Sequence, residues 1–128
     1  MAGAWCGDCV AQCPIWARFE KVTDKIRVRY VDRDADPELA QELKICGGSR
    51  VPQVVFLSEQ FKPVGWYGDR TLTRYREMAE QLDGAACSTG LVTDKDTLTG
   101  VVQDWLNEFE RVQLILRLSP SLRKIHGD

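Results

Sequence analysis

The sequence predicts an α/β domain that is followed by a helical extension. Two observations predict this class: helical and extended patterns alternate over residues 1–84, and one long amphipathic pattern follows a loop at residues 85–96. A length of 128 residues is that of one ordinary domain with a short extension. We therefore predict an α/β domain over residues 1–84 and a helical extension over residues 85–128 that packs on the domain.

Apolar spacing and helix-start residues predict the first three elements. Residues 5–21 carry apolar side chains at near-helical spacing and predict a helix that is kinked at Pro14. Residues 25–32 alternate apolar and charged side chains with a period of two, which predicts a strand. Asp36 directly before Pro37 is typical of a helix start, so a short helix is expected there.

A hairpin and a further helix follow. Residues 54–57 are a compact apolar run, and residues 61–67 form a second run after a polar turn, so the two predict a β-hairpin. Asp69 and Thr71 offer side chains that can cap the next helix, which should end at Gly84.

The C-terminal part carries one strong pattern. Residues 97–118 place their apolar side chains in a broad stripe, which predicts a long helix that needs a surface to cover. Residues 119–128 show no periodic pattern.

Charge and hydropathy exclude several classes of partner. The formal net charge is −2, and the 17 basic residues are interleaved with the 19 acidic ones. Without a basic stripe, neither nucleic acid nor an anionic membrane is an expected partner. No run approaches the roughly 18 apolar residues of a membrane span, and Met1 to Ala4 cannot hold the regions of a signal peptide. We therefore expect a cytoplasmic protein.

The cysteines are the candidate chemical groups. The sequence has five of them: Cys6, Cys9, Cys13, Cys46 and Cys87. Their odd number and wide spacing do not suit a secreted disulfide scaffold, which leaves thiol chemistry, metal binding or plain burial.

Cys6 and Cys9 lie two residues apart at a predicted helix start. Free N–H groups and the helix dipole stabilise a thiolate there, so Cys6 is the expected nucleophile. Cys9, one turn further in, would attack the mixed disulfide and release the reduced substrate.

Three segments of the sequence carry a family resemblance. Trp5-Cys6-Gly7-Asp8-Cys9, the strand ending Tyr30-Val31-Asp32, and Arg50-Val51-Pro52 before an apolar run resemble the thioredoxin superfamily. The match covers roughly Ala4 to Leu82. It implies a thioredoxin-like mixed sheet flanked by helices, with the helix at residues 97–118 as an addition.

The resemblance also implies a function and the residues that perform it. The chain would reduce protein disulfides and be recharged by an upstream thiol reductase, with the Cys6–Cys9 disulfide as its redox group and no metal or other cofactor. Pro52 would be cis beside the thiols, and the Val51 backbone would pair with an extended substrate segment. Trp5 would be an exposed indole that flanks the thiols.

The sequence departs from the family in three places. Gly7-Asp8 stands where thioredoxins carry Gly-Pro, and the Asp8 carboxylate both disfavours a second negative charge and suits a first helical turn. We expect Gly7 and Asp8 to modulate the thiols, and a reductant more than a strong oxidant. Gln53 stands where the family usually has threonine. Only Met1 to Ala4 precede the motif, where the family has a central strand with a buried acidic group, so the first strand is expected to be missing.

Two other functions remain open from the residues alone. The chain could be a non-catalytic thioredoxin-like interaction module. It could also be a zinc-binding variant whose ligands would be Cys6, Cys9, Cys13 and one of Cys46 or Cys87. Apart from that alternative, Cys13 reads as a buried structural thiol, and Cys46 and Cys87 as bystanders.

Overall fold

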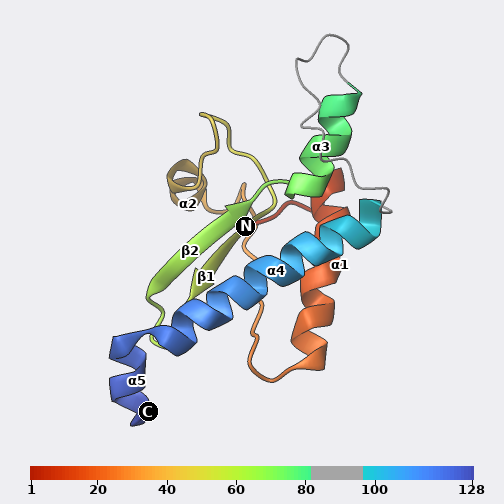
Figure 1. Ribbon diagram of the computed structural model, residues 1–128. Coiled ribbons are helices and arrows are strands. Elements are labelled where there is room, and N and C mark those ends of the chain that lie inside the picture. Colours follow the sequence, from red (N-terminus) through yellow and green to blue (C-terminus); the bar gives the residue numbers. More distant parts are fainter. Residues whose placement is uncertain (82–96) are drawn as a thin grey trace. The chain divides into compact units, whose positions relative to one another are not determined.

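The computed structural model describes residues 1–81 and 97–128 (Figure 1). Tertiary contacts divide the chain into two compact units, Met1–Asp69 and Arg70–Asp128. The predicted domain boundary at residue 84 and the predicted packing of the extension on the domain stay predictions.

Helix α1 (Gly7–Val22) opens the first unit. It confirms the helix predicted over residues 5–21, and Pro14 lies within it. Cys6 is the N-cap residue, in an extended conformation, and its side chain makes no capping hydrogen bond. The buried face of the helix consists of Cys9, Gln12, Ile15 and Trp16.

The strand predicted over residues 25–32 is wrong, although its alternation is real. Ile26 and Val28 are partly buried while their charged neighbours are exposed, as the period of two requires. The segment is extended but forms no ladder with another described segment. Among residues 1–81 and 97–128 its one bridge is a parallel one between Asp32 and Ala2. A strand needs a partner of similar length. The Val28 amide instead donates to the Glu20 carboxylate at 3.0 Å.

Met1 and Ala2 lie between this extended segment and the hairpin. The Ala2 amide donates to the Val31 carbonyl at 2.9 Å, and the Arg33 amide donates to the Ala2 carbonyl at 3.0 Å. On the other side, Met1 and Gln53 exchange two backbone hydrogen bonds, of 2.8 and 2.9 Å. No strand is assigned to Met1 and Ala2, yet they pair on both sides as a central strand does.

Helix α2 (Pro37–Glu42) starts as the sequence predicts. The Asp36 carboxylate accepts a hydrogen bond from the Leu39 amide at 3.0 Å, which satisfies one of the free donors of the first turn. Ala40 is the buried residue of this short helix.

Strands β1 (Gln53–Leu57) and β2 (Pro63–Gly68) form the predicted antiparallel hairpin, drawn in yellow-green and green in Figure 1. The register is regular from Gln53 opposite Gly68 to Phe56 opposite Gly65, and an irregularity follows before Leu57 pairs with Pro63. Within the described residues the sheet has these two strands only, so the mixed sheet is reduced to an antiparallel hairpin and one parallel bridge.

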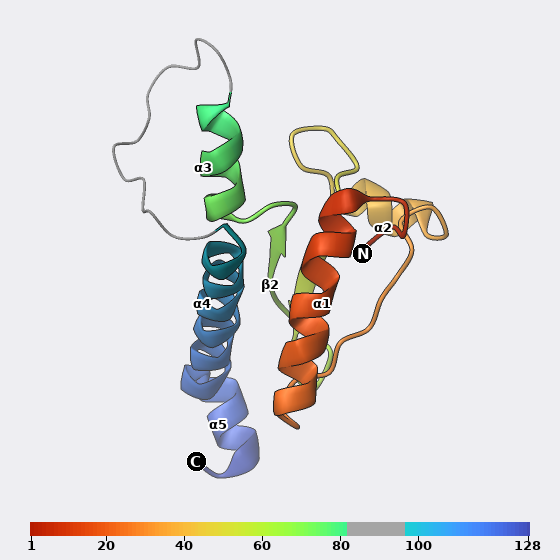
Figure 2. The ribbon, with the colours of Figure 1, turned by 90° about the vertical axis from the view of Figure 1, so that its right-hand side faces the viewer.

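The second unit consists of helices. These are α3 (Leu72–Glu80), α4 (Thr97–Leu118) and α5 (Pro120–His126). Helix α4 confirms the helix predicted over residues 97–118, and Trp105 on it is fully buried. Figure 2 shows α3 near the first turns of α4, where the Thr73 amide donates to the Asp104 carboxylate at 2.8 Å.

One prediction about a helix end needs correction, and another falls outside the described residues. Thr71 is the N-cap of α3 but its hydroxyl makes no capping bond, because Asp104 already accepts the amide of Thr73. Capping by Asp69 stays a prediction, and its carboxylate faces Arg50. The expected helix end at Gly84 lies in the part that the structure leaves undescribed.

The C-terminal segment forms a helix that the sequence analysis missed. The Ser119 hydroxyl accepts from the Leu122 amide, Pro120 occupies the first turn, and Gly127 ends α5 in the left-handed region. The sequence did contain signals of a helix: Ser119 and Pro120 at its start and Gly127 at its end. Seven residues are too few for a periodic pattern to reveal a helix.

The contact between α3 and α4 yields a stability prediction. A Cβ atom at Gly100 would lie 2.5 Å from Cγ2 of Thr73. We expect Gly100→Ala to lower the free energy of unfolding by about 1–3 kcal/mol, as overpacking does, although alanine favours a helix over glycine. In a Thr73→Ala background, which removes that methyl group, the same change should be neutral or stabilising. Urea unfolding measures both, and a single Gly100→Ala variant as stable as wild type would contradict the contact.

Candidate active site

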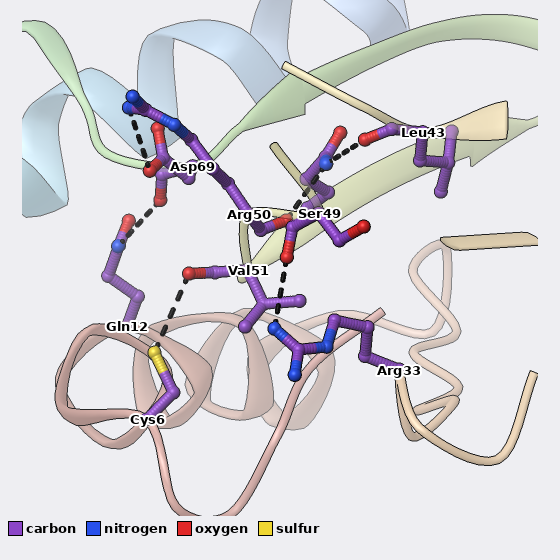
Figure 3. Close-up of polar contacts among 9 residues, drawn as sticks. Cys6, Gln12, Arg33, Leu43, Ser49, Arg50, Val51 and Asp69 are labelled. Atoms are coloured by element: carbon purple, nitrogen blue, oxygen red, sulfur yellow. Dashed lines mark hydrogen bonds and ion pairs between the residues drawn. The ribbon is translucent and has the colours of Figure 1, made fainter. Parts of the chain in front are cut away.

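Cys6 and Cys9 differ in exposure. Cys6 is partly exposed at the start of α1, whereas Cys9 is 3% exposed in the first turn. Both are free thiols in the structure. The Cys6 thiol donates a hydrogen bond to the Val51 carbonyl at 3.5 Å, which Figure 3 draws between the helix and the segment that contains Val51. An exposed first thiol and a buried second one suit attack followed by resolution.

The surroundings of Cys9 hold it in the protonated form. The pKa of Cys9 is raised to about 12, mainly by burial and in part by a hydrogen bond with the Cys6 side chain. The Gly3 amide opposes this shift, because it donates to the Cys9 sulfur at 3.4 Å. Cys9 is therefore a neutral thiol at physiological pH and does not compete with Cys6 as a nucleophile.

Val51 lies against the Cys6 thiol, and Pro52 follows it in the chain. The Val51–Pro52 peptide bond is cis, the isomer that the family resemblance implies. Val51 is 6% exposed and the Pro52 side chain is fully buried. The structure thus brings together Cys6, Cys9, Val51 and Pro52, which lie more than 40 residues apart in two groups.

Trp5 is 58% exposed beside the thiol pair, and Arg33 lies over its ring at 4.3 Å from the centroid. This distance is within the range of a cation–π contact. Its indole also covers Gly3, where a Cβ atom would approach Cε2 of Trp5 to 2.6 Å. Arg33 in turn donates to the Ser49 carbonyl at 3.1 Å, next to Arg50 (Figure 3).

Gly7 and Asp8 separate the two cysteines in the first turn of α1. A Cβ atom at Gly7 would meet nothing within 4 Å, so this side of the motif is open. Asp8 is an acidic residue in the first turn, where a negative charge interacts favourably with the helix dipole.

Cys13 lies one turn after Cys9, beside a pocket of about 420 Å³. Cys9, Cys13 and Tyr30 line this pocket together with residues 2–4. Burial raises the pKa of the Cys13 thiol, and the Tyr30 hydroxyl donates to the Cys13 carbonyl at 3.2 Å. Cys13 is partly exposed, which corrects the predicted burial, and its role as a structural thiol stays a prediction.

Residues 1–81 and 97–128 contain no group of side chains that could serve as a zinc site. No three of the histidine, cysteine, aspartate and glutamate side chains in these ranges gather as metal ligands would. Cys46 is exposed, and Cys87 lies outside the described residues.

A family model described as thioredoxin matches residues 1–83. The chain belongs to the thioredoxin family. The match confirms the resemblance found in the sequence and is compatible with the α/β class of the fold. No curated protein and no solved structure matches the chain.

The sequence analysis gave no site role to four polar residues that the structure places around the thiol pair and Val51: Gln12, Arg33, Arg50 and Asp69. Only Arg50 belongs to a quoted segment, and the contacts of all four join segments that are distant in the sequence. Of these residues, Arg50 could have been suspected from the sequence, because it directly precedes Val51.

None of the described helices is both long enough and apolar enough to cross a membrane.

The difference between the two thiols predicts their rates of alkylation. In the reduced protein at neutral pH, iodoacetamide should modify Cys6 first and Cys9 last. A pKa near 12 rather than 9.0 lowers the thiolate fraction of Cys9 about a thousandfold. Peptide mass analysis over time gives the rate at each cysteine, with the exposed Cys46 as an internal reference. Labelling of Cys9 as fast as Cys46 would contradict the buried position.

Proposed function

We propose that the chain is a thiol–disulfide oxidoreductase that reduces protein disulfides through Cys6 and Cys9. The observation that carries this proposal is the asymmetry of the pair. Cys6 is accessible at a helix N-terminus, and Cys9 is buried one turn inside, within hydrogen-bond reach of Cys6. Family membership supports redox chemistry at such a pair without naming a substrate.

The reaction has two exchange steps. The Cys6 thiolate attacks one sulfur of a substrate disulfide, the substrate S–S bond breaks, and the other substrate sulfur leaves and takes up a proton. Cys9 then loses its proton and attacks the Cys6 sulfur of the mixed disulfide. This releases the second substrate thiol and forms the Cys6–Cys9 disulfide, so two electrons pass from the chain to the substrate.

The high pKa of Cys9 supports this order of the two steps. A thiol that stays protonated in the free protein does not attack substrate, so the first step belongs to Cys6. In the mixed disulfide Cys6 no longer carries a thiol, so the two causes by which Cys6 raises the pKa of Cys9, a hydrogen bond and a charge interaction, are gone. Deprotonation of Cys9 is then easier at the moment when it must react.

Substrate would lie across Trp5, Val51 and Pro52. An extended substrate segment that pairs with the backbone of Val51 places its sulfur near Cys6, because the Val51 carbonyl is 3.5 Å from that thiol. Backbone pairing makes few demands on substrate sequence, which suits many protein disulfides.

An upstream thiol reductase would return two electrons to the Cys6–Cys9 disulfide, with no metal or other cofactor. A dithiol that has to be kept reduced fits the cytoplasm, which is the compartment that we propose.

Turnover of a protein disulfide tests the function. With dithiothreitol as the recharging thiol, we expect reduction of insulin by the wild-type chain and a loss of about a thousandfold or more in Cys6→Ser, which lacks the nucleophile. Cys9→Ser should accumulate a mixed disulfide through Cys6 that mass analysis detects. Cys46→Ser, which changes an exposed thiol outside the site, is the matched control and should keep its rate.

Two results would count against the proposal. Activity that survives Cys6→Ser refutes the assigned nucleophile. A wild-type chain that is folded and reduced but does not turn over insulin would favour the non-catalytic interaction module.

A further inference from the structure

Three polar side chains are buried next to the thiols, and the exchange chemistry does not use them. Gln12, Gln53 and Asp69 are exposed by 4%, 1% and 2%. Burial of polar groups is unfavourable unless they find hydrogen-bonding or charged partners, so the partners of these groups reveal what they hold in place.

Gln12 and Asp69 connect the thiol helix to the end of β2. The Gln12 amide donates to the backbone carbonyl of Asp69 at 2.9 Å, as Figure 3 shows. Gln12 follows Cys9 by three residues and lies on the same buried face of α1. The backbone at Asp69 is therefore fixed relative to the helix that carries both cysteines.

Asp69 and Arg50 form the next connection. The Asp69 carboxylate lies 3.7 Å from the Arg50 guanidinium, with exposed side-chain fractions of 3% and 44% (Figure 3). A carboxylate that is so well buried interacts more strongly with a cation than an exposed one does. Arg50 directly precedes Val51, so this ion pair restrains the segment that approaches Cys6.

Gln53 holds the same segment from the other side. Its side-chain amide donates to the Arg50 carbonyl at 2.9 Å and also to the Leu43 carbonyl. The glutamine that stands in place of the family's usual threonine thus points inward, away from solvent. Arg50 is held at its guanidinium by Asp69 and at its backbone by Gln53.

We propose that Asp69 is a positioning residue for substrate. Its backbone carbonyl anchors Gln12 and its carboxylate restrains Arg50, so it sets the distance between Cys6 and the backbone of Val51 with which substrate would pair. This inference rests on the proposed function. It adds that recognition of an extended polypeptide depends on Asp69, whereas reaction of Cys6 with a small disulfide does not.

The test compares two exchange equilibria in a Cys9→Ser background, where the mixed disulfide cannot be resolved. In each, the Cys6 thiol exchanges with a disulfide, forming a mixed disulfide and releasing one thiol. One reagent is the disulfide-linked dimer of a short extended peptide with one central cysteine. The other is the disulfide of 2-mercaptoethanol, which has no backbone to pair with Val51.

Asp69→Asn should lower the exchange constant for the peptide about tenfold and that for 2-mercaptoethanol by less than about twofold. The reason is that only the peptide uses the position of Val51. Arg50→Gln removes the cation of the ion pair, and the Arg50 side chain is half-exposed. This variant should also lower the peptide constant and leave the 2-mercaptoethanol constant nearly unchanged. Arg50→Lys, which keeps a positive charge beside Asp69, should lose less.

Asp24→Asn is the matched control, because Asp24 pairs with Lys25 at 3.4 Å while both side chains are at least 75% exposed. It should change neither constant. Circular dichroism establishes that each variant folds, and if Asp69→Asn does not, the Arg50→Gln result decides.

The positioning role is wrong if the variants keep the peptide constant within about twofold of the parent, or if both constants fall together. These equilibria do not require turnover. If the wild-type chain fails to reduce insulin while the variants in the Cys9→Ser background show the difference between the two constants, the enzyme proposal is overturned and the positioning role is retained.

Discussion

The site depends on the close approach of two segments, the start of α1 and the Arg50-Val51-Pro52 turn. The 3.5 Å contact between the Cys6 thiol and the Val51 carbonyl is where they meet. A thiol makes only weak hydrogen bonds, so this contact cannot hold the segments together by itself. Other interactions must bring them to this distance, and the burial of Cys9, Val51 and Pro52 and the buried polar contacts of Gln12 and Asp69 contribute to it.

The same arrangement makes two chemically identical thiols different. Cys6 lies at the helix N-cap, where it is accessible, and Cys9 lies one turn deeper, under the backbone of Gly3. Burial keeps Cys9 protonated, and a nucleophile needs exposure as well as ionisation. The Gly3 amide limits the pKa shift of Cys9, which would be larger without it. Residues 1–4 therefore contribute to the chemistry as well as to the pairing beside β1.

The sequence predicted those features that depend on local pattern. The helices at residues 5–21 and 97–118, the cap at Asp36 and the hairpin were correct, because each follows from neighbouring residues alone. The prediction of a strand at residues 25–32 was wrong because a strand requires a partner, and within the described part of the chain the segment bridges to Ala2 alone. Thr71 failed for a similar reason, since Asp104, which lies 31 residues beyond Thr73, accepts that donor. Cys6, Cys9, Val51 and Pro52 could be picked out in the sequence, whereas Gln12, Arg50 and Asp69 act through contacts that no local pattern encodes.

Polar connections behind the site serve a purpose that apolar packing serves less well. Apolar contacts are non-directional, so they oppose a gap but do not fix an orientation. A hydrogen bond weakens steeply when its angle changes, and leaving a buried carboxylate unpaired is costly. Gln12, Asp69 and Gln53 therefore restrain the Val51 segment in direction as well as in distance. The proposed exchange between sulfurs would demand such restraint, because an incoming disulfide would have to meet Cys6 while Cys9 stays within reach of the bond that forms.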